Sequence, residues 1–208
     1  SACADPPRDQ QCVGEDGHRA PDDRRRPRRT ACRRRRTGAA HGGNRTGRMF
    51  TGDSSGDFLF AALHRAGFAN QPGSTHRADG LALSDAYVLA PVRCAPPDNR
   101  PTPDELARCR PFFERELALL PRVRVLLALG GIGWASTLAV LAAHGAEVPR
   151  PAPAFGHGAD VALDLPGRGR VALLGSYHVS RQNTNTGRLT PAMFDGVLAR
   201  AKLLLASP

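Results

Sequence analysis

Short apolar runs that alternate with amphipathic stretches constrain the fold of this chain more than any other feature. The runs 86–92 (AYVLAPV), 123–129 (VRVLLAL) and 170–176 (RVALLGS) have the length and apolar content of buried strands. Helical patterns surround these runs, at residues 57–66, 102–120, 132–143 and 190–205. Strands that alternate with helices predict a mostly parallel sheet covered by helices. We therefore expect an α/β fold.

The helix that follows residue 101 carries the clearest start signal. Thr102 is placed to cap it, Pro103 takes the first helical position and Glu105 completes a capping box. Pro111 lies inside the same pattern and is a candidate kink. These signals fix the start of the helix closely.

The first 37 residues lack the apolar content that a folded segment requires. They contain eleven arginines, and Val13 is their single aliphatic residue larger than alanine. Such a segment cannot bury enough apolar surface to offset the entropy lost on ordering, so we expect disorder. One interpretation is a basic arm that binds DNA. The other is a misread segment, produced by reading a G+C-rich gene in a shifted frame. In both cases the folded domain is expected over residues 38–208.

The charge of the chain points to a polyanionic partner. Lys and Arg number 29 against 19 Asp and Glu, which gives a formal net charge of +10. An arginine-rich proteome is the alternative explanation.

No run of about 18 apolar residues is present, so no membrane span is expected. No basic-then-apolar signal pattern begins the sequence, so we expect a cytoplasmic protein. Five cysteines in a cytoplasmic protein indicate metal ligands or inert thiols rather than disulfides.

Three polar segments follow, or should follow, the carboxyl ends of strands. They are residues 41–53 (HGGNRTGRMFTGD), 93–102 (RCAPPDNRPT) and 176–188 (SYHVSRQNTNTGR). Ligands of open parallel sheets bind outside the carboxyl ends of the strands. We therefore predict one site where these three segments meet.

The segment 129–133 (LGGIG) offers a rival interpretation. Gly131 and Gly133 match the start of a dinucleotide-binding fingerprint, but Ser136 replaces the third glycine. No acidic residue is well placed about 20 positions later. A tight strand-to-helix turn is the better interpretation.

Three long blocks carry a family resemblance. Residues 41–53, 92–112 (VRCAPPDNRPTPDELARCRPF) and 176–194 (SYHVSRQNTNTGRLTPAMF) resemble the signature blocks of family 5 uracil-DNA glycosylases. This family is the iron–sulfur branch of its superfamily, and the resemblance covers residues 39–205. It implies a three-layer α/β/α sandwich with a four-stranded, mostly parallel sheet. It also implies excision of uracil, and often of other deaminated bases, from DNA.

The resemblance assigns the catalytic residues. His178 matches the histidine that donates a hydrogen bond to the uracil carbonyl as negative charge develops there. Asp53 matches an acid suited to position water or support the sugar cation; the alternative role is a carboxylate at a helix N-terminus. Asn99 matches an asparagine that assists catalysis, with a turn role as the alternative.

Further matched residues are expected to bind the flipped nucleotide and its flanking phosphates. Phe50 matches an aromatic that stacks on the extruded base, with plain core packing as the alternative. Arg45 and Arg48 either serve the DNA face or are merely solvated. The remaining substrate contacts implied by the blocks are His41, Gly42, Ser180, Asn183 and Arg188, of which Ser180 is the favoured phosphate contact.

The cofactor of this family is a 4Fe–4S cluster, which needs four cysteine thiolates. Cys94 and Cys109 match two of them, whereas Cys3, Cys12 and Cys32 do not form the expected N-terminal C-x-x-C pair. The apolar strand expected before the first block is also replaced, here by TACRRRRTG. Four consecutive arginines cannot form the central strand of a buried sheet.

The sequence thus predicts a monomeric, monofunctional DNA repair glycosylase. It would hydrolyse the bond between uracil and deoxyribose in double- or single-stranded DNA and leave an abasic site. The single lysine, Lys202, is no candidate for a lyase step. The alternative is a catalytically impaired, DNA-binding remnant of a glycosylase. Lesion preference and the opposing base stay open.

Overall fold

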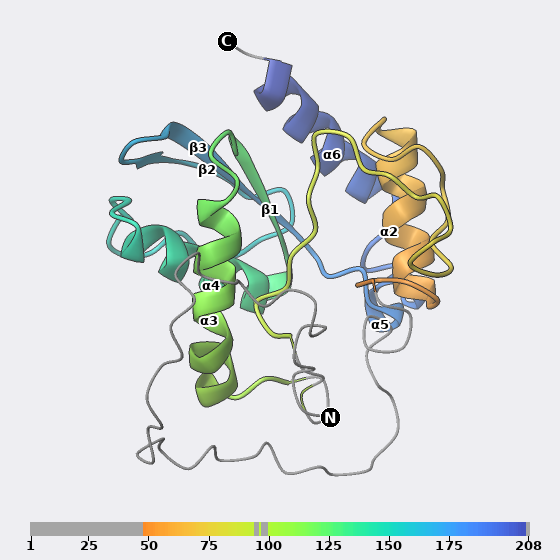
Figure 1. The fold of residues 1–208 in the computed structure, drawn as a ribbon, viewed down its shortest axis with the longest axis horizontal. Helices are drawn as coiled ribbons and strands as arrows, with labels where there is room; N and C mark the ends of the chain where they lie inside the picture. Colours follow the sequence, from red (N-terminus) through yellow and green to blue (C-terminus); the bar gives the residue numbers. More distant parts are fainter. Residues whose placement is uncertain (1–47, 94–95, 97–99, 207–208) are drawn as a thin grey trace, which may run out of the picture.

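The computed structural model describes residues 48–93, 96 and 100–206, and the folded part is built on a small mixed sheet (Figure 1). Strands β1 (Val125–Leu129), β2 (Asp160–Leu165) and β3 (Gly169–Ser176) lie in the order β1-β3-β2. The basic segment 1–37 and the place of the expected first strand lie outside the described residues.

Strands β1 and β3 pair in parallel, as the alternation of strands and helices predicted. Leu126 pairs with Leu173 and Leu129 with Ser176. The carboxyl ends of both strands therefore lie at the same edge of the sheet. This register places the residues that follow Leu129 next to those that follow Ser176.

Strand β2 was missed in the sequence, and it runs antiparallel to β3. Its burial alternates, with Leu163 and Leu165 buried between exposed Ala162 and Asp164. This is the pattern of an edge strand with one solvated face, which a search for continuous apolar runs overlooks. The described part of the sheet therefore has three strands and one antiparallel pair. The four-stranded, mostly parallel sheet and its three-layer sandwich stay predictions.

The described residues also form five helices: α2 (Ser54–Arg65), α3 (Pro103–Ala118), α4 (Gly130–Ala143), α5 (Arg181–Asn185) and α6 (Pro191–Ala206). The capping box of α3 is confirmed, because the Thr102 hydroxyl accepts from the Glu105 amide and the Glu105 carboxylate accepts from the Thr102 amide. The helix is assigned continuously through Pro111. Sequence patterns therefore located α2, α3, α4 and α6, and missed the short α5.

The strand predicted at residues 86–92 is wrong. This segment is irregular, and the nearest pairing is an isolated bridge between Ala69 and Leu83. Ala86 and Leu89 pack against two different hydrophobic clusters, while Tyr87 is 57% exposed. Because the segment spans two clusters at the surface, its apolar residues do not line up on a sheet.

Helices cover both faces of the sheet. Val171 and Leu173 of β3 pack with Phe113 of α3 and Leu141 of α4. The alternate residue of β3, Leu174, packs with buried residues of α6, and α6 in turn packs against α2, as Figure 1 shows. The edge formed by β1 and β3 is therefore flanked by helices on both faces of the sheet. None of the helices in the described residues is long and apolar enough to cross a membrane.

Candidate active site

The edge of the sheet that carries the candidate site includes the point where β1 passes directly into α4. Gly130 has a φ of +82°, and a Cβ at this position would lie 3.3 Å from the Cβ of His178. The left-handed backbone strongly favours glycine here, and an added Cβ would also press on the histidine. Gly130 forms the predicted tight turn and packs on His178, while Gly131 and Gly133 lie in the first turn of α4.

Phe50 lies beside His178 although the two residues come from distant parts of the chain. Their ring centroids are 6.0 Å apart, with an interplanar angle of 41°. Phe50 also has a φ of 52°, an uncommon value for a non-glycine residue. A Cβ on Gly56 would lie 1.9 Å from the carbonyl oxygen of Phe50, so only glycine fits where α2 meets this loop. The first and last sequence blocks therefore meet, as predicted.

Arg48 ties the Phe50 loop to a neighbouring turn. Its guanidinium donates to the Ser74 hydroxyl (2.9 Å), to the Asp79 carboxylate (2.8 Å) and to the Arg77 carbonyl (2.9 Å). Thr51 is fully buried and its hydroxyl lies 2.6 Å from that of Ser74. The alternative of a merely solvated charge is therefore wrong for Arg48, and its DNA contact stays a prediction. Arg48 supports the loop through these internal hydrogen bonds.

Asp79 is the acidic centre of this support. Burial of its carboxyl works to raise its pKa, but hydrogen bonds from the Leu81 amide, from Arg48 and from the Thr75 and His76 amides lower it. The net pKa of Asp79 lies well below the ordinary value of an aspartate. Because the folded-state pKa is depressed, the carboxylate stabilises the turn at neutral pH and loses this contribution only in strong acid.

Asp53 follows Phe50 and caps helix α2. Its backbone is extended, and its Oδ1 accepts a hydrogen bond of 2.9 Å from the Gly56 amide. The role of a carboxylate at a helix N-terminus is therefore confirmed. The side chain is exposed, and the cap uses one of its two oxygens. Capping and a catalytic role are thus compatible.

The segment after β3 folds back to hold His178. The amide of Asn183 donates to the His178 carbonyl at 2.9 Å. Ser180 begins α5 without a side-chain cap, and the guanidinium of Arg188 lies 4.8 Å from the centre of the Tyr177 ring. The structure thus gives Asn183 a supporting contact that the sequence did not predict, and it places Arg188 against the residue that precedes His178.

A second histidine and two aromatic residues escaped the sequence analysis. His157 stacks on Tyr177 with ring centroids 5.1 Å apart, and Phe155 lies 6.3 Å from Tyr177 in an edge-to-face contact. Phe155 also contacts Trp134 of α4, at 6.1 Å. The signal available in the sequence was a histidine between two glycines, at 156–158, just before a strand.

Several predicted site residues lie outside the described part of the chain: His41, Gly42, Arg45, Cys94 and Asn99. Cys109 is described, and its side chain is buried in α3. Within the described residues no three His, Cys, Asp or Glu side chains form a group that could hold a metal ion. The described part of the chain therefore supplies one thiol of the four that a 4Fe–4S cluster requires.

Comparison with known proteins gives a consistent result. The family model of the uracil DNA glycosylase superfamily matches residues 38–202. The type-5 uracil-DNA glycosylase of Mycobacterium tuberculosis is 53% identical over 167 residues, which are 80% of this chain and 59% of that protein. The type-5 uracil-DNA glycosylase of Thermus thermophilus is 54% identical over 165 residues, which are 79% of this chain and 71% of that protein. The type-5 uracil-DNA glycosylase of Pyrobaculum aerophilum is 44% identical over 163 residues, which are 78% of this chain and 66% of that protein. The chain thus spans about 59% of the length of the mycobacterial relative.

Proposed function

The chain belongs to the uracil DNA glycosylase superfamily, and from this premise we propose that it is a monofunctional enzyme that excises uracil from DNA. The proposal rests on one observation. Phe50 and His178, which come from two separate sequence blocks, lie with their ring centroids 6.0 Å apart at the edge formed by β1 and β3. An aromatic face beside a hydrogen-bond donor suits a flipped base. Relatives named type-5 uracil-DNA glycosylases support the choice of uracil.

The reaction requires little of the protein besides placement and charge. Phe50 stacks on the extruded uracil, and His178 donates a hydrogen bond to its carbonyl oxygen. As the bond between base and sugar breaks, the bonding electrons leave with the uracil, and the deoxyribose becomes a cation. Asp53 stabilises this cation and orients a water whose oxygen bonds to the sugar carbon. The water loses a proton to solvent, the uracil anion gains one, and an abasic site remains.

The DNA strand on either side of the flipped nucleotide needs separate contacts. Ser180, Asn183 and Arg188 lie on the segment that carries His178, and hydroxyl, amide and guanidinium groups all suit phosphate oxygens. We assign His41, Gly42 and Asn99 to the same substrate site on their sequence match alone. The net charge of +10 supports binding to DNA, single- or double-stranded. We propose a monomer that works on DNA in the cytoplasm.

Incubation with a uracil-containing duplex tests the proposed function. We expect alkali-labile strand breaks at the uracil and none at a thymine in the same position, since hydrolysis leaves an abasic site. The duplex with thymine serves as the matched control, and binding to both duplexes is measured in parallel. Binding to DNA without any break would contradict the proposal and identify a DNA-binding remnant instead.

We also propose that Cys94 and Cys109 are two of four ligands of a 4Fe–4S cluster. Cys109 of α3 and Cys94 of the segment before it would hold the cluster, which would supply a covalent link between these two parts of the chain. Purified protein is expected to contain iron and acid-labile sulfide, and Cys109→Ser is expected to lower both sharply. Single serine substitutions at Cys3, Cys12 and Cys32 serve as the comparison, because they report which thiols complete the set. Purified wild-type protein free of iron would contradict this proposal and leave the glycosylase proposal untouched.

A further inference from the structure

His157 contacts the backbone of the proposed site, although the family resemblance assigned it no role. It lies in the loop before β2, and none of the three sequence blocks contains it. The start of β2 and the end of β3 lie at the same sheet edge, because Asp160 pairs with Leu174. The loop therefore reaches the edge where His178 lies, on the opposite side of β3 from Gly130 and β1.

The loop that carries His157 is fixed to the end of β3. The Gly158 amide donates to the Gly175 carbonyl at 2.8 Å, and the Gly175 amide donates to the Ala159 carbonyl at 2.8 Å. A Cβ on Gly175 would lie 2.5 Å from the Gly156 carbonyl oxygen, so the loop and the strand are in closest contact there. The loop that carries His157 is thus joined to the end of β3 by two backbone hydrogen bonds.

The imidazole of His157 contacts the backbone next to His178. The Tyr177 amide donates to Nδ1 of His157 at 3.3 Å. The Ser176 hydroxyl lies 3.4 Å from the same nitrogen and donates its proton to the Tyr177 carbonyl at 3.0 Å. Nδ1 must offer a lone pair to the amide, so the ring proton lies on Nε2.

The backbone that carries His178 is thereby held on both sides. On one side His157 accepts from the Tyr177 amide and stacks on the Tyr177 ring. On the other side Asn183 donates to the His178 carbonyl. Gly130 packs against the His178 side chain, because an added Cβ at position 130 would lie 3.3 Å from the Cβ of His178.

We propose that His157 is a positioning residue for His178, an inference that rests on the proposed base-binding role of His178. A hydrogen-bond donor contributes to catalysis only when it is held at the place where charge develops, and small displacements are costly. His157 acts through its Nδ1, which fixes the peptide before His178. It does not touch the substrate.

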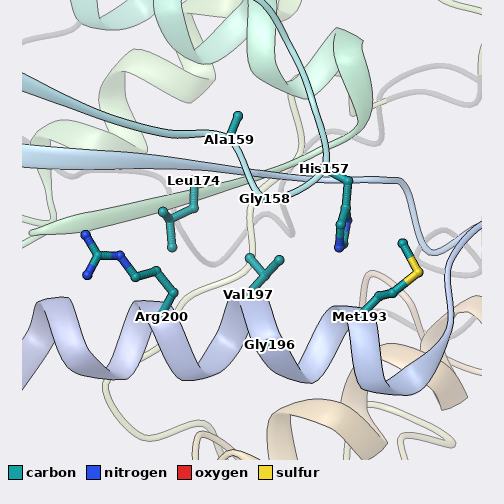
Figure 2. A pocket seen from close by; sticks show the side chains of 8 residues that line it. All are labelled: His157, Gly158, Ala159, Leu174, Met193, Gly196, Val197 and Arg200. Carbon is teal, nitrogen blue, oxygen red and sulfur yellow. The ribbon is translucent and has the colours of Figure 1, made fainter.

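The surroundings of His157 make this proposal testable by substitution. His157 lines a cavity of about 260 Å³ between β3 and α6, together with Leu174, Met193, Val197 and Arg200 (Figure 2). Arg200 at the far end of this cavity is paired with Asp160, with N and O 2.6 Å apart. The cavity lies beside the ring of His157, so the larger ring of phenylalanine has open space on that side.

Two substitutions separate the two contacts of His157. His157→Phe keeps a ring that stacks on Tyr177 but has no acceptor. His157→Asn loses the ring but places its Oδ1 where Nδ1 of histidine lies. If the acceptor positions His178, the asparagine variant retains the function and the phenylalanine variant does not. Thermal unfolding of both variants shows that each is folded.

The first readout does not depend on activity. In protein labelled with nitrogen-15 at histidine, we expect long-range proton–nitrogen spectra to show Nδ1 of His157 unprotonated. The ring signals of His178 are expected to shift or broaden in His157→Phe and to stay near their wild-type positions in His157→Asn. His178 signals that are identical in all three proteins, or a protonated Nδ1 in the wild type, would overturn the proposal.

The second readout is single-turnover excision of uracil. We expect His157→Phe to slow excision roughly ten-fold with DNA affinity unchanged, and His157→Asn to restore most of the rate. Equal rates for the wild type and His157→Phe would overturn the role of His157. A wild type that excises no uracil would instead overturn the proposed function, and the spectra would still decide whether His157 positions His178.

Discussion

Replacing His178 by alanine is expected to slow uracil excision by about a hundred- to a thousand-fold, the usual effect of removing one donor to a developing oxyanion. The affinity for uracil-containing DNA is expected to stay nearly unchanged. The reason is that the histidine acts on charge that appears only as the bond breaks, whereas phosphate contacts such as those proposed for Ser180 and Arg188 act in the ground state as well. The ring of Phe50 remains available to stack on the base.

Single-turnover kinetics with protein in excess measure the rate, and a titration of the same duplex measures the affinity. His64→Ala is a matched control, because His64 is exposed in the last turn of α2 and takes no part in the proposed site. The control is expected to behave as the wild type in both assays. Parallel losses of rate and affinity in His178→Ala would mean that His178 binds DNA rather than the transition state.

The sequence predicted those elements whose local and tertiary signals agree. Helix α3 has its capping box, and β1 and β3 are apolar runs that the fold buries between helices. In each case the local pattern matched the final environment, so the pattern was enough. The sequence predicted parallel strands from their alternation with helices, and β1 and β3 are such a pair, with α4 and β2 in the connection between them.

The sequence failed where the environment of a segment depends on distant neighbours. Residues 86–92 read as a strand because they are apolar, yet they bridge two hydrophobic clusters at the surface. Strand β2 reads as polar because one of its faces is solvated. Composition alone does not distinguish an apolar segment that joins clusters from one that enters a sheet.

The residues of the site divide in the same way, into those that the sequence predicted and those that only the fold brings together. The family resemblance of the sequence blocks implied that Phe50 and His178 belong to one site, and the structure brings their rings together. It did not predict that Arg48 would tie the Phe50 loop to Asp79, nor that His157 would accept from the Tyr177 amide. These supports are ordinary side chains whose function lies in the partner they contact, and the partner is set by the fold.

Replacing Asp53 by asparagine is expected to separate the two roles of this residue. Asparagine caps a helix about as well as aspartate, so α2 should keep its cap to Gly56 and the melting temperature should change little. The negative charge is lost, so the sugar cation loses its support and excision should slow by about a hundred-fold. Differential scanning calorimetry and single-turnover kinetics measure the two effects independently.

Asp53→Ala supplies the matched comparison, because it removes the cap and the charge together. We expect the same loss of rate as in Asp53→Asn, with an additional loss of about 1 kcal/mol of stability from the missing cap. If Asp53→Asn excised uracil at the wild-type rate while Asp53→Ala unfolded earlier, Asp53 would be a cap alone. The sugar cation would then have to be stabilised from another position, and Asn99, the remaining catalytic match, would be the next residue to replace.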